Sequence, residues 1–405
     1  MKKIMLICAP VSSRSGYGDH ARDLVRSFIE HDKYDIKIID VNWGSTPRDA
    51  LDIELDKNII DCILPEPKMD RQPDVYVDIR IPNEFQTWGK VNIGITAGIE
   101  TTAVSSNWID SCNKMDLIIV PSEHSKDGFV KALYEKMQNL PNGQQQKIGE
   151  LKLEKPIEVL FEGADSIFKP LDTPSLNLID NIEEDFCFLN VGLWGQGGYG
   201  EDRKDIAKTI KIFFESFANK KKQPALILKT NSATFSILDR EECLKRINHI
   251  KSMFPKDWNL PNVYLLHGSL SSEEMNKLYN HPKVKAFILL GGELVQVPQS
   301  QHWENIVIPE SQWFNVNETQ AYKAMNYCFE NYDEVKEKAL NLMKINRDKF
   351  TLDKMIEKLD EIVTPYIDKV PSQVGIKLPK LKKANSSDKP KIKLPKLKKK
   401  NEATV

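Results

Sequence analysis

Residues 4–21 read Ile4-Met-Leu-Ile-Cys-Ala-Pro-Val-Ser-Ser-Arg-Ser-Gly-Tyr-Gly-Asp-His-Ala21. A short apolar run leads into a loop with two glycines, and Leu24, Val25 and Phe28 continue with the spacing of an amphipathic helix. A buried strand, a glycine loop and a helix in this order are typical of the first unit of a parallel α/β sheet. Glycines at the start of a helix let backbone N–H groups approach a phosphate or an oxygen-rich sugar. The stretch therefore predicts both a fold class and one wall of a ligand site.

The same alternation of strand and helix continues in two series. Further apolar runs occur in the first series at residues 36–41, 75–79, 91–96, 117–121 and 157–161, and in the second at 186–191, 225–230, 263–267 and 284–290. Longer helical patterns separate these runs, which is typical of parallel α/β units. We therefore predict an α/β fold with two Rossmann-like domains and a cleft.

Domain boundaries follow from length and composition. A chain of 405 residues is too long for one ordinary core. Residues 166–184 contain proline, aspartate and asparagine without strong periodicity, which indicates a linker. The predicted parts are 1–168 (first domain), 169–184 (linker), 185–350 (second domain, shortened after 290), 351–369 (a C-terminal helix folding back across the domains) and 370–405 (a disordered tail).

Composition indicates a globular, cytoplasmic protein. Apolar residues make up 40% of the chain and charged residues 28%, and no apolar run approaches the roughly 20 residues that span a bilayer. The six cysteines show neither the spacing of a zinc site nor that of a disulfide framework, so we expect reduced thiols and no bound metal.

The tail differs from the rest of the chain. Residues 370–405 hold eleven lysines against Asp388 and Glu402, and Ile-Lys-Leu-Pro-Lys-Leu-Lys-Lys occurs at both 376–383 and 392–399. A solvated linker explains this composition. The alternative is electrostatic docking to an anionic surface such as a membrane, a nucleic acid or a capsid.

The glycine loop also matches a dinucleotide fingerprint. Gly16, Gly18 and Ala21 satisfy Gly-x-Gly-x-x-Gly/Ala, and Asp40 stands where a ribose-binding acid belongs. That fingerprint places its first glycine directly at the strand end, whereas Pro10 to Ser15 intervene here. An NAD-dependent enzyme is therefore an alternative, not the leading hypothesis.

A second ligand-site candidate follows the strand predicted at 91–96. Glu100 comes just after it, and the carboxyl edge of a parallel sheet is where ligands of such folds bind. A carboxylate there suits sugar hydroxyls. The alternative is helix capping, by Glu100 and also by Ser122.

Basic residues in the second half of the chain are further candidates for a ligand site. Arg203 and Lys204 open a helix after a glycine-rich loop, where they suit a diphosphate or form a solvated basic pair. Lys229 ends an apolar strand, and a lysine at an otherwise buried edge usually meets an anion.

These segments together resemble the GT-B glycosyltransferases of family 4 (group 1), which include sucrose, mannosyl and phosphatidylinositol mannosyl transferases. The matching segments are 15–18, 96–100, 120–125, 159–168, 190–194, 201–205 and 267–274. The segment 159–168 departs from the family's turn by Phe161-Glu162 before its glycine and by Ala164 in place of valine.

The resemblance implies a retaining transfer of a hexose from a UDP- or GDP-sugar to a glycan or other hydroxyl acceptor. The nucleotide sugar is then a co-substrate, and no separate cofactor or metal is needed because basic side chains can neutralise the diphosphate. The residues in these roles are Arg203, Lys204 and Lys229 for catalysis, Ser15, Gly16, Tyr17, Gly18 and Glu100 for acceptor or sugar binding, and Gly192, His267, Gly268 and Glu293 for nucleotide binding.

The family pattern breaks after residue 290. The family has a glycine-rich turn and two glutamates eight positions apart; Glu310 and Glu318 keep that spacing, but no glycine turn precedes them. Glu293 is another candidate for the sugar contact. Only 27 residues separate Leu290 from Glu318, too few for the two or three further βα units of about 30 residues each, so the C-terminal sheet should be truncated. The competing hypothesis is a decayed transferase that acts as a sugar- or nucleotide-binding module.

Overall fold

The computed structural model describes residues 2–141, 143–232, 234–285 and 291–371. Within it, Lys2–Pro371 form one compact unit, so the boundary predicted between two domains stays a prediction. The repeats at 376–383 and 392–399 lie outside the described residues.

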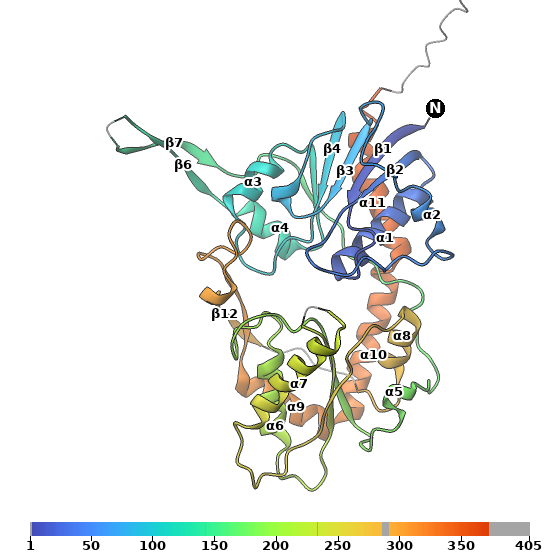
Figure 1. Ribbon diagram of the computed structural model, residues 1–405, viewed down its shortest axis with the longest axis vertical. Coiled ribbons are helices and arrows are strands. Elements are labelled where there is room, and N and C mark those ends of the chain that lie inside the picture. The colour runs from blue at the N-terminus through green and yellow to red at the C-terminus, as the bar shows by residue number, and fades with distance from the viewer. Residues whose placement is uncertain (1, 142, 233, 286–290, 372–405) are drawn as a thin grey trace, which may run out of the picture. The chain divides into compact units, whose positions relative to one another are not determined.

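Six parallel strands form the first sheet, as the spacing of apolar runs predicts (Figure 1). Their order is β2-β1-β3-β4-β5-β8. The bounds are β1 Lys3–Ala9, β2 Tyr34–Asp40, β3 Val75–Ile79, β4 Val91–Ile95, β5 Leu117–Val120 and β8 Ile157–Val159. Successive side chains of a strand point to opposite faces, so Met5 and Ile7 enter one core while Leu6 and Cys8 enter another.

Helices cover both faces of this sheet. The apolar stripe of α1 (Gly16–Glu30) packs on one face through Leu24, Val25 and Phe28, as predicted. The other face carries α3 (Ser106–Cys112) and α4 (Glu123–Val130), which bury Trp108 and Phe129. Short helical turns occur at α2 (Lys57–Ile60) and η1 (Pro82–Glu84).

A helix from the end of the described chain completes the first core. The last helix, α11 (Leu352–Ile367), lies beside α1 and buries Met355, Leu359 and Val363 with it (Figure 1). Gly163 makes this return possible, because a methyl group there would lie 2.6 Å from the Cα of Leu352. A helix over these residues is what the sequence predicts.

The second sheet has three parallel strands in the described part of the chain, in the order β11-β10-β9. They are β9 (Cys187–Val191), β10 (Ala225–Lys229) and β11 (Val263–Leu265). Its helices are α5 Asn177–Asp180, α6 Ile206–Phe217, α7 Ile237–Lys251, α8 Ser272–Asn280, α9 Glu318–Glu330 and α10 Tyr332–Lys349. Of the fourth predicted strand, Val284 bridges Cys187 in parallel, and residues 286–290 lie outside the described ranges.

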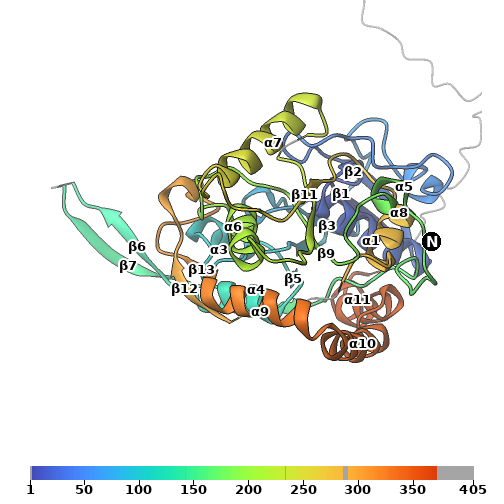
Figure 2. The same ribbon diagram turned by 90° about the horizontal axis from the view of Figure 1, so that it is seen from below.

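Two antiparallel hairpins depart from the parallel plan, and neither was predicted. One consists of β6 (Tyr134–Asn139) and β7 (Gln145–Leu151) and extends away from the first sheet in both Figure 1 and Figure 2. The other consists of β12 (Gly292–Gln296) and β13 (Gln312–Val316), with the short turn η2 (Gln299–Gln301) between them. Residues 291–316 thus form a hairpin in place of further βα units.

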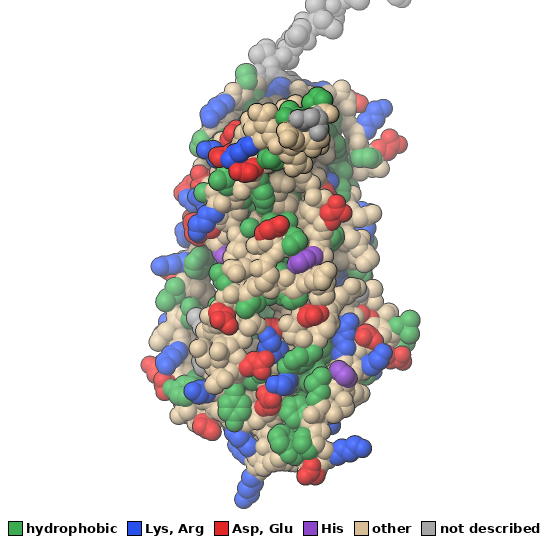
Figure 3. Space-filling view, turned by 90° about the vertical axis from the view of Figure 1, so that its left-hand side faces the viewer, with side chains coloured by type: hydrophobic (Ala, Val, Ile, Leu, Met, Phe, Trp, Pro, Cys, Tyr) green, Lys and Arg blue, Asp and Glu red, His purple; other side chains and the backbone are tan. Residues whose placement is uncertain are grey.

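Charged groups of both signs are interspersed on the surface shown in Figure 3, and neither sign gathers into a continuous patch there. Among the described helices, none combines the length and apolar content that a membrane span requires.

Candidate functional site

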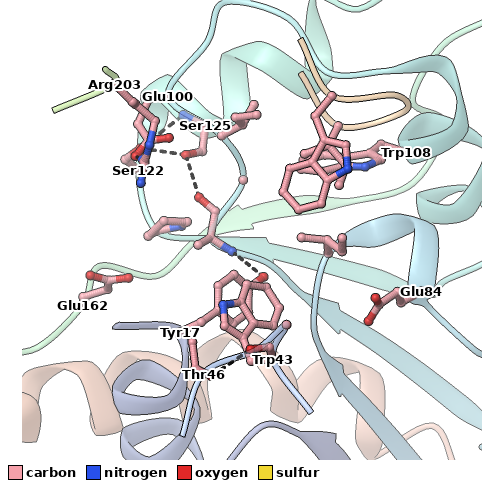
Figure 4. A pocket seen from close by; sticks show the side chains of 18 of the residues that line it. Tyr17, Trp43, Thr46, Glu84, Glu100, Trp108, Ser122, Ser125, Glu162 and Arg203 are labelled. Atoms are coloured by element: carbon pink, nitrogen blue, oxygen red, sulfur yellow. Dashed lines mark hydrogen bonds and ion pairs between the residues drawn. The ribbon is translucent and has the colours of Figure 1, made fainter. Parts of the chain in front are cut away.

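A cavity of about 780 Å³ lies at the carboxyl edge of the first sheet (Figure 4). Segments that follow β1, β2, β3, β4, β5 and β8 all line it. The lining residues from the first half of the chain are Tyr17, residues 42–46, Ile81, Glu84, residues 97–100, Trp108, residues 121–122 and 124–125, and Glu162. From the second half of the chain come Arg203, Trp303 and Ile306. This is the edge at which parallel α/β sheets bind ligands, and we call it the sheet-edge cavity.

Tyr17 forms an aromatic wall of the cavity. Its ring stacks on Trp43 with centroids 3.9 Å apart, and its hydroxyl accepts a hydrogen bond from the Ala97 N–H at 3.1 Å and donates to the Arg80 carbonyl at 2.8 Å. Burial raises the pKa of this hydroxyl, which therefore stays protonated. Since its hydroxyl is already bonded within the protein, Tyr17 offers a ligand its ring.

The rest of the predicted glycine loop shapes the wall without lining it. Ser15 caps α1 by accepting from the Gly18 N–H at 3.1 Å, and the Ser13 hydroxyl bonds Ser15 at 2.8 Å and Thr46 at 2.6 Å. Gly18 is required sterically, because a methyl group there would lie 2.1 Å from the Ser13 carbonyl oxygen. A methyl group added at Gly16, by contrast, would meet no heavy atom within 4 Å.

Glu100 and Arg203 meet at one end of the cavity. They form an ion pair, although they are far apart in sequence, and in Figure 4 they lie beside Ser122, away from Glu84. Ser122 caps α4 by accepting from the Ser125 N–H at 3.1 Å, so its predicted capping role is confirmed. The cavity thus has a guanidinium at this end that a phosphate group can share.

Asp202 positions Arg203, and sequence reasoning missed it. Asp202 is 2% exposed, and its carboxylate accepts from three backbone N–H groups, those of Gly195 (3.1 Å), Lys204 (3.3 Å) and Ile206 (3.0 Å). A carboxylate at the start of α6 suits the positive end of the helix dipole. The role of Asp202 could have been predicted from the sequence, because an aspartate comes directly before a basic pair at the start of a helix.

Lys204 does not follow Arg203 into the cavity. It lines a separate hollow of about 300 Å³ with Asn190, Asp205 and Lys208. Its pKa is lowered, first by its removal from water and then by the positive charge of Arg203. The two cations are therefore close, but only Arg203 lines the sheet-edge cavity.

Lys229 belongs to a cluster at the carboxyl end of β10. Its ammonium donates to the Gly268 carbonyl at 2.6 Å, and its own carbonyl accepts from the Gly192 N–H at 3.1 Å. Burial lowers the pKa of Lys229. Three predicted residues, Gly192, Lys229 and Gly268, are thus brought together.

His267 and Arg14 extend this cluster. His267 bonds the buried carboxylate of Asp239 at 2.8 Å, so its ring is fixed by a residue that sequence reasoning missed. Arg14, from the first glycine loop, donates to the hydroxyl of Ser269 at 3.0 Å. The loop after β1 therefore contacts the loop after β11.

The candidate glutamates of the second half do not line the cavity. Glu293 is exposed on β12 opposite Asn315, Glu310 is exposed before β13, and Glu318 pairs with Lys211 at 3.3 Å. Among the described residues, no cluster of three or more histidine, cysteine, aspartate or glutamate side chains is arranged for a metal ion.

Asp40, the candidate ribose-binding acid of the dinucleotide alternative, already has partners for both oxygens. Oδ1 accepts from the Ser12 N–H at 3.2 Å, and Oδ2 accepts from the Ser12 hydroxyl at 2.5 Å and from Arg48 at 2.7 Å. These bonds fix the loop after β1 and leave the carboxylate little capacity for a ribose.

Comparisons with known proteins found similar structures only. No family model matches the sequence, and no curated protein matches it. The solved structures similar to this chain include Anabaena Alr3699/HepE in complex with UDP and glucose, which is 11% identical over 90% of this chain and 100% of that chain, with a TM-score of 0.49. The trehalose 6-phosphate synthase of Burkholderia multivorans is 9% identical over 92% and 100%, with a TM-score of 0.48, and the UDP-forming enzyme of Burkholderia xenovorans is 11% identical over 92% and 100%, with a TM-score of 0.46.

Proposed function

We propose that this chain is a glycosyltransferase of the GT-B type that moves a hexose from a UDP- or GDP-sugar to a hydroxyl of a glycan or similar acceptor, with retention. One observation carries the proposal: a cavity lined by aromatic rings and carboxylates meets, at one end, a guanidinium from a glycine-rich loop of the other half of the chain. Such a lining suits hydroxyl-rich ligands, and such a cation suits a phosphate.

The donor would bind along the loops of the second sheet. Lys229, Gly192 and Gly268 lie together there, and Gly268 has a φ of +118°, a backbone conformation that glycine adopts freely. A donor diphosphate would compete with the Gly268 carbonyl for the ammonium of Lys229 and with Glu100 for Arg203. Glu100, once released, would be free to accept from a sugar hydroxyl.

The transfer step that we propose is a single concerted exchange of bonds. The acceptor oxygen bonds to the anomeric carbon while the bond from that carbon to the diphosphate breaks, and the diphosphate leaves with the electron pair. The acceptor proton goes to the departing phosphate oxygen on the same face of the sugar, which gives retention. Arg203 and Lys229 offset the charge that develops on the leaving group, whereas Lys204 lines a separate hollow.

The test measures nucleotide release. The purified full-length chain is incubated with a panel of UDP- and GDP-sugars, with and without glycan acceptors, and the anomeric configuration of the product is read by NMR. We expect release that depends on acceptor and is lost in Arg203→Ala and Lys229→Ala but kept in Lys245→Ala, a side chain 81% exposed on α7. A folded protein that releases no UDP or GDP from any donor refutes the proposal.

A binding module without turnover is the second candidate. It is favoured by Glu293, Glu310 and Glu318, none of which lines the cavity. Tight binding of a nucleotide sugar with no release would support it. We also propose a cytoplasmic location: the six cysteines, all of which lie within the described residues, form no disulfide, as a reducing compartment permits.

A further inference from the structure

The segment 297–311, which joins β12 to β13 and which we call the strap, is bonded to the first half of the chain. The carbonyl of Asn305 accepts from the Ser105 hydroxyl at 2.8 Å, and its side-chain oxygen accepts from Asn107 at 2.7 Å. Just beyond the strap, the Gln312 N–H donates to the Thr102 hydroxyl at 3.0 Å. These bonds hold the strap against the start of α3, at the border of the sheet-edge cavity.

The strap is also bonded to the glycine-rich loop that carries Arg203. The Ser300 hydroxyl donates to Glu201 at 2.8 Å, and the Gln301 side chain donates to the Gln196 carbonyl at 2.7 Å. The strap therefore joins the loop of the predicted donor side to the wall of the acceptor side.

Trp303 is the side chain that the strap brings to the cavity. The backbone of Trp303 exchanges two hydrogen bonds with Val307, at 3.1 and 2.9 Å, and Asn305 between them has a φ of +61°. Within this tight turn, Ile306 packs against the core around Trp108. Trp303 lines the cavity and is 64% exposed, so a rigid turn presents a large ring to an incoming ligand.

The charge around the cavity favours an uncharged ligand. Among the described residues, Glu84, Glu100 and Glu162 line it, with Arg203 as the single lining lysine or arginine. Behind Glu84, Arg80 lies 3.5 Å away but is bonded to a further carboxylate, that of Asp78.

Four carboxylates against two guanidinium groups leave an excess of two negative charges. Two histidines of the described chain lie beside these carboxylates. His124 lines the cavity, with its ring nitrogen 3.2 Å from the Glu100 carbonyl oxygen. His20 lies 3.9 Å from Glu162, and burial lowers its pKa. A phosphate, sulfate or carboxylate on the acceptor would be repelled.

On the basis of the proposed function, we infer that the acceptor is an uncharged glycosyl unit and that Trp303, supplied by the strap, determines acceptor specificity. The C–H face of an uncharged sugar lies against aromatic rings such as those of Trp43 and Trp303, while its hydroxyls bond the carboxylates. A donor diphosphate would be held at the end of the cavity where Arg203 lies.

The experiment measures glycan binding, which needs no turnover. The full-length chain is applied without donor to a printed panel that holds neutral glycans beside their phosphorylated, sulfated and sialylated forms, and affinities for the hits are measured by calorimetry. We expect neutral glycans to bind at least about tenfold more tightly than their acidic forms, and Trp303→Ala to weaken binding by about tenfold. Trp303→Phe should keep most of the affinity because it keeps a ring.

Two further variants separate specificity from folding. Trp258→Ala removes a tryptophan that is 40% exposed and does not line the cavity, so it should bind like the parent chain. The double variant Glu84→Gln with Glu162→Gln removes two negative charges. It should therefore reduce the difference in affinity between neutral and acidic glycans.

The outcomes distinguish this inference from the proposed function. A preference for acidic glycans, no binding of any neutral glycan, or unchanged affinity in Trp303→Ala overturns the inference, even if nucleotide is released with a phosphorylated acceptor. Neutral glycan binding that depends on Trp303, without nucleotide release from any donor, supports the inference and refutes the transferase.

Discussion

The substitution Gly18→Ala tests how the loop after β1 is built. The added methyl group would lie 2.1 Å from the Ser13 carbonyl oxygen, against 3.4–4 Å for an ordinary van der Waals contact. The carbonyl cannot yield easily, because the Arg22 guanidinium holds it at 2.9 Å while also holding the Val11 carbonyl at 2.7 Å. The whole turn must therefore shift.

The magnitude follows from two opposing effects. Overpacking of a fixed site costs about 1–3 kcal/mol, and the upper end applies because the clash is with backbone. Alanine in place of glycine within α1 returns up to about 1 kcal/mol through helix propensity. The expected net loss is about 2 kcal/mol in the free energy of unfolding, which lowers Tm by about 3 °C for a compact unit as large as Lys2–Pro371.

Gly16→Ala is the matched control. It lies in the same helical turn, but no heavy atom lies within 4 Å of its added methyl group, so stability should be unchanged or raised by up to about 1 kcal/mol. Unfolding of both variants by denaturant, followed by circular dichroism, gives the comparison. Equal stability of Gly18→Ala and Gly16→Ala would refute the packing of Gly18 against Ser13 and, with it, the account of how Tyr17 is positioned.

Three further predictions concern Asp202, Asp23 and Lys229. Asp202→Ala leaves three backbone N–H groups without their carboxylate and should lower the free energy of unfolding by about 2–4 kcal/mol, measured by denaturant, whereas Asp202→Asn, which keeps one oxygen, should lose less. Burial raises the pKa of Asp23 to about 6, above its unfolded value of 3.8, so its contribution to stability improves as pH falls through about 6. The stability difference between Asp23→Asn and the parent chain should therefore shrink from pH 7 to pH 5, and a constant difference would contradict this. Lys229→Met should weaken UDP or GDP binding by at least about tenfold in calorimetry, and unchanged affinity would remove Lys229 from the nucleotide site.

Much of the first sheet is determined by local sequence. Strands of three to seven residues, most of them apolar and separated by helical patterns, are typical of a parallel sheet whose central strands are buried on both faces. The positions of Tyr17 and Glu100 at the cavity follow from the same logic, since each comes just after a strand whose carboxyl end forms the ligand edge. Ser122 was also predictable as a cap from its place before α4.

Other parts were decided only by tertiary structure, because they depend on contacts between distant segments. The divergence of Arg203 and Lys204 depends on the turn that Asp202 fixes, and no periodicity in the sequence reports that turn. In the sequence, the strap is a polar loop with one tryptophan. Its place beside the cavity depends on hydrogen bonds between Asn305 and residues about 200 positions earlier. Sequence thus determined which strand ends border the sheet-edge cavity, whereas the folded chain decided which side chains from the second half reach it.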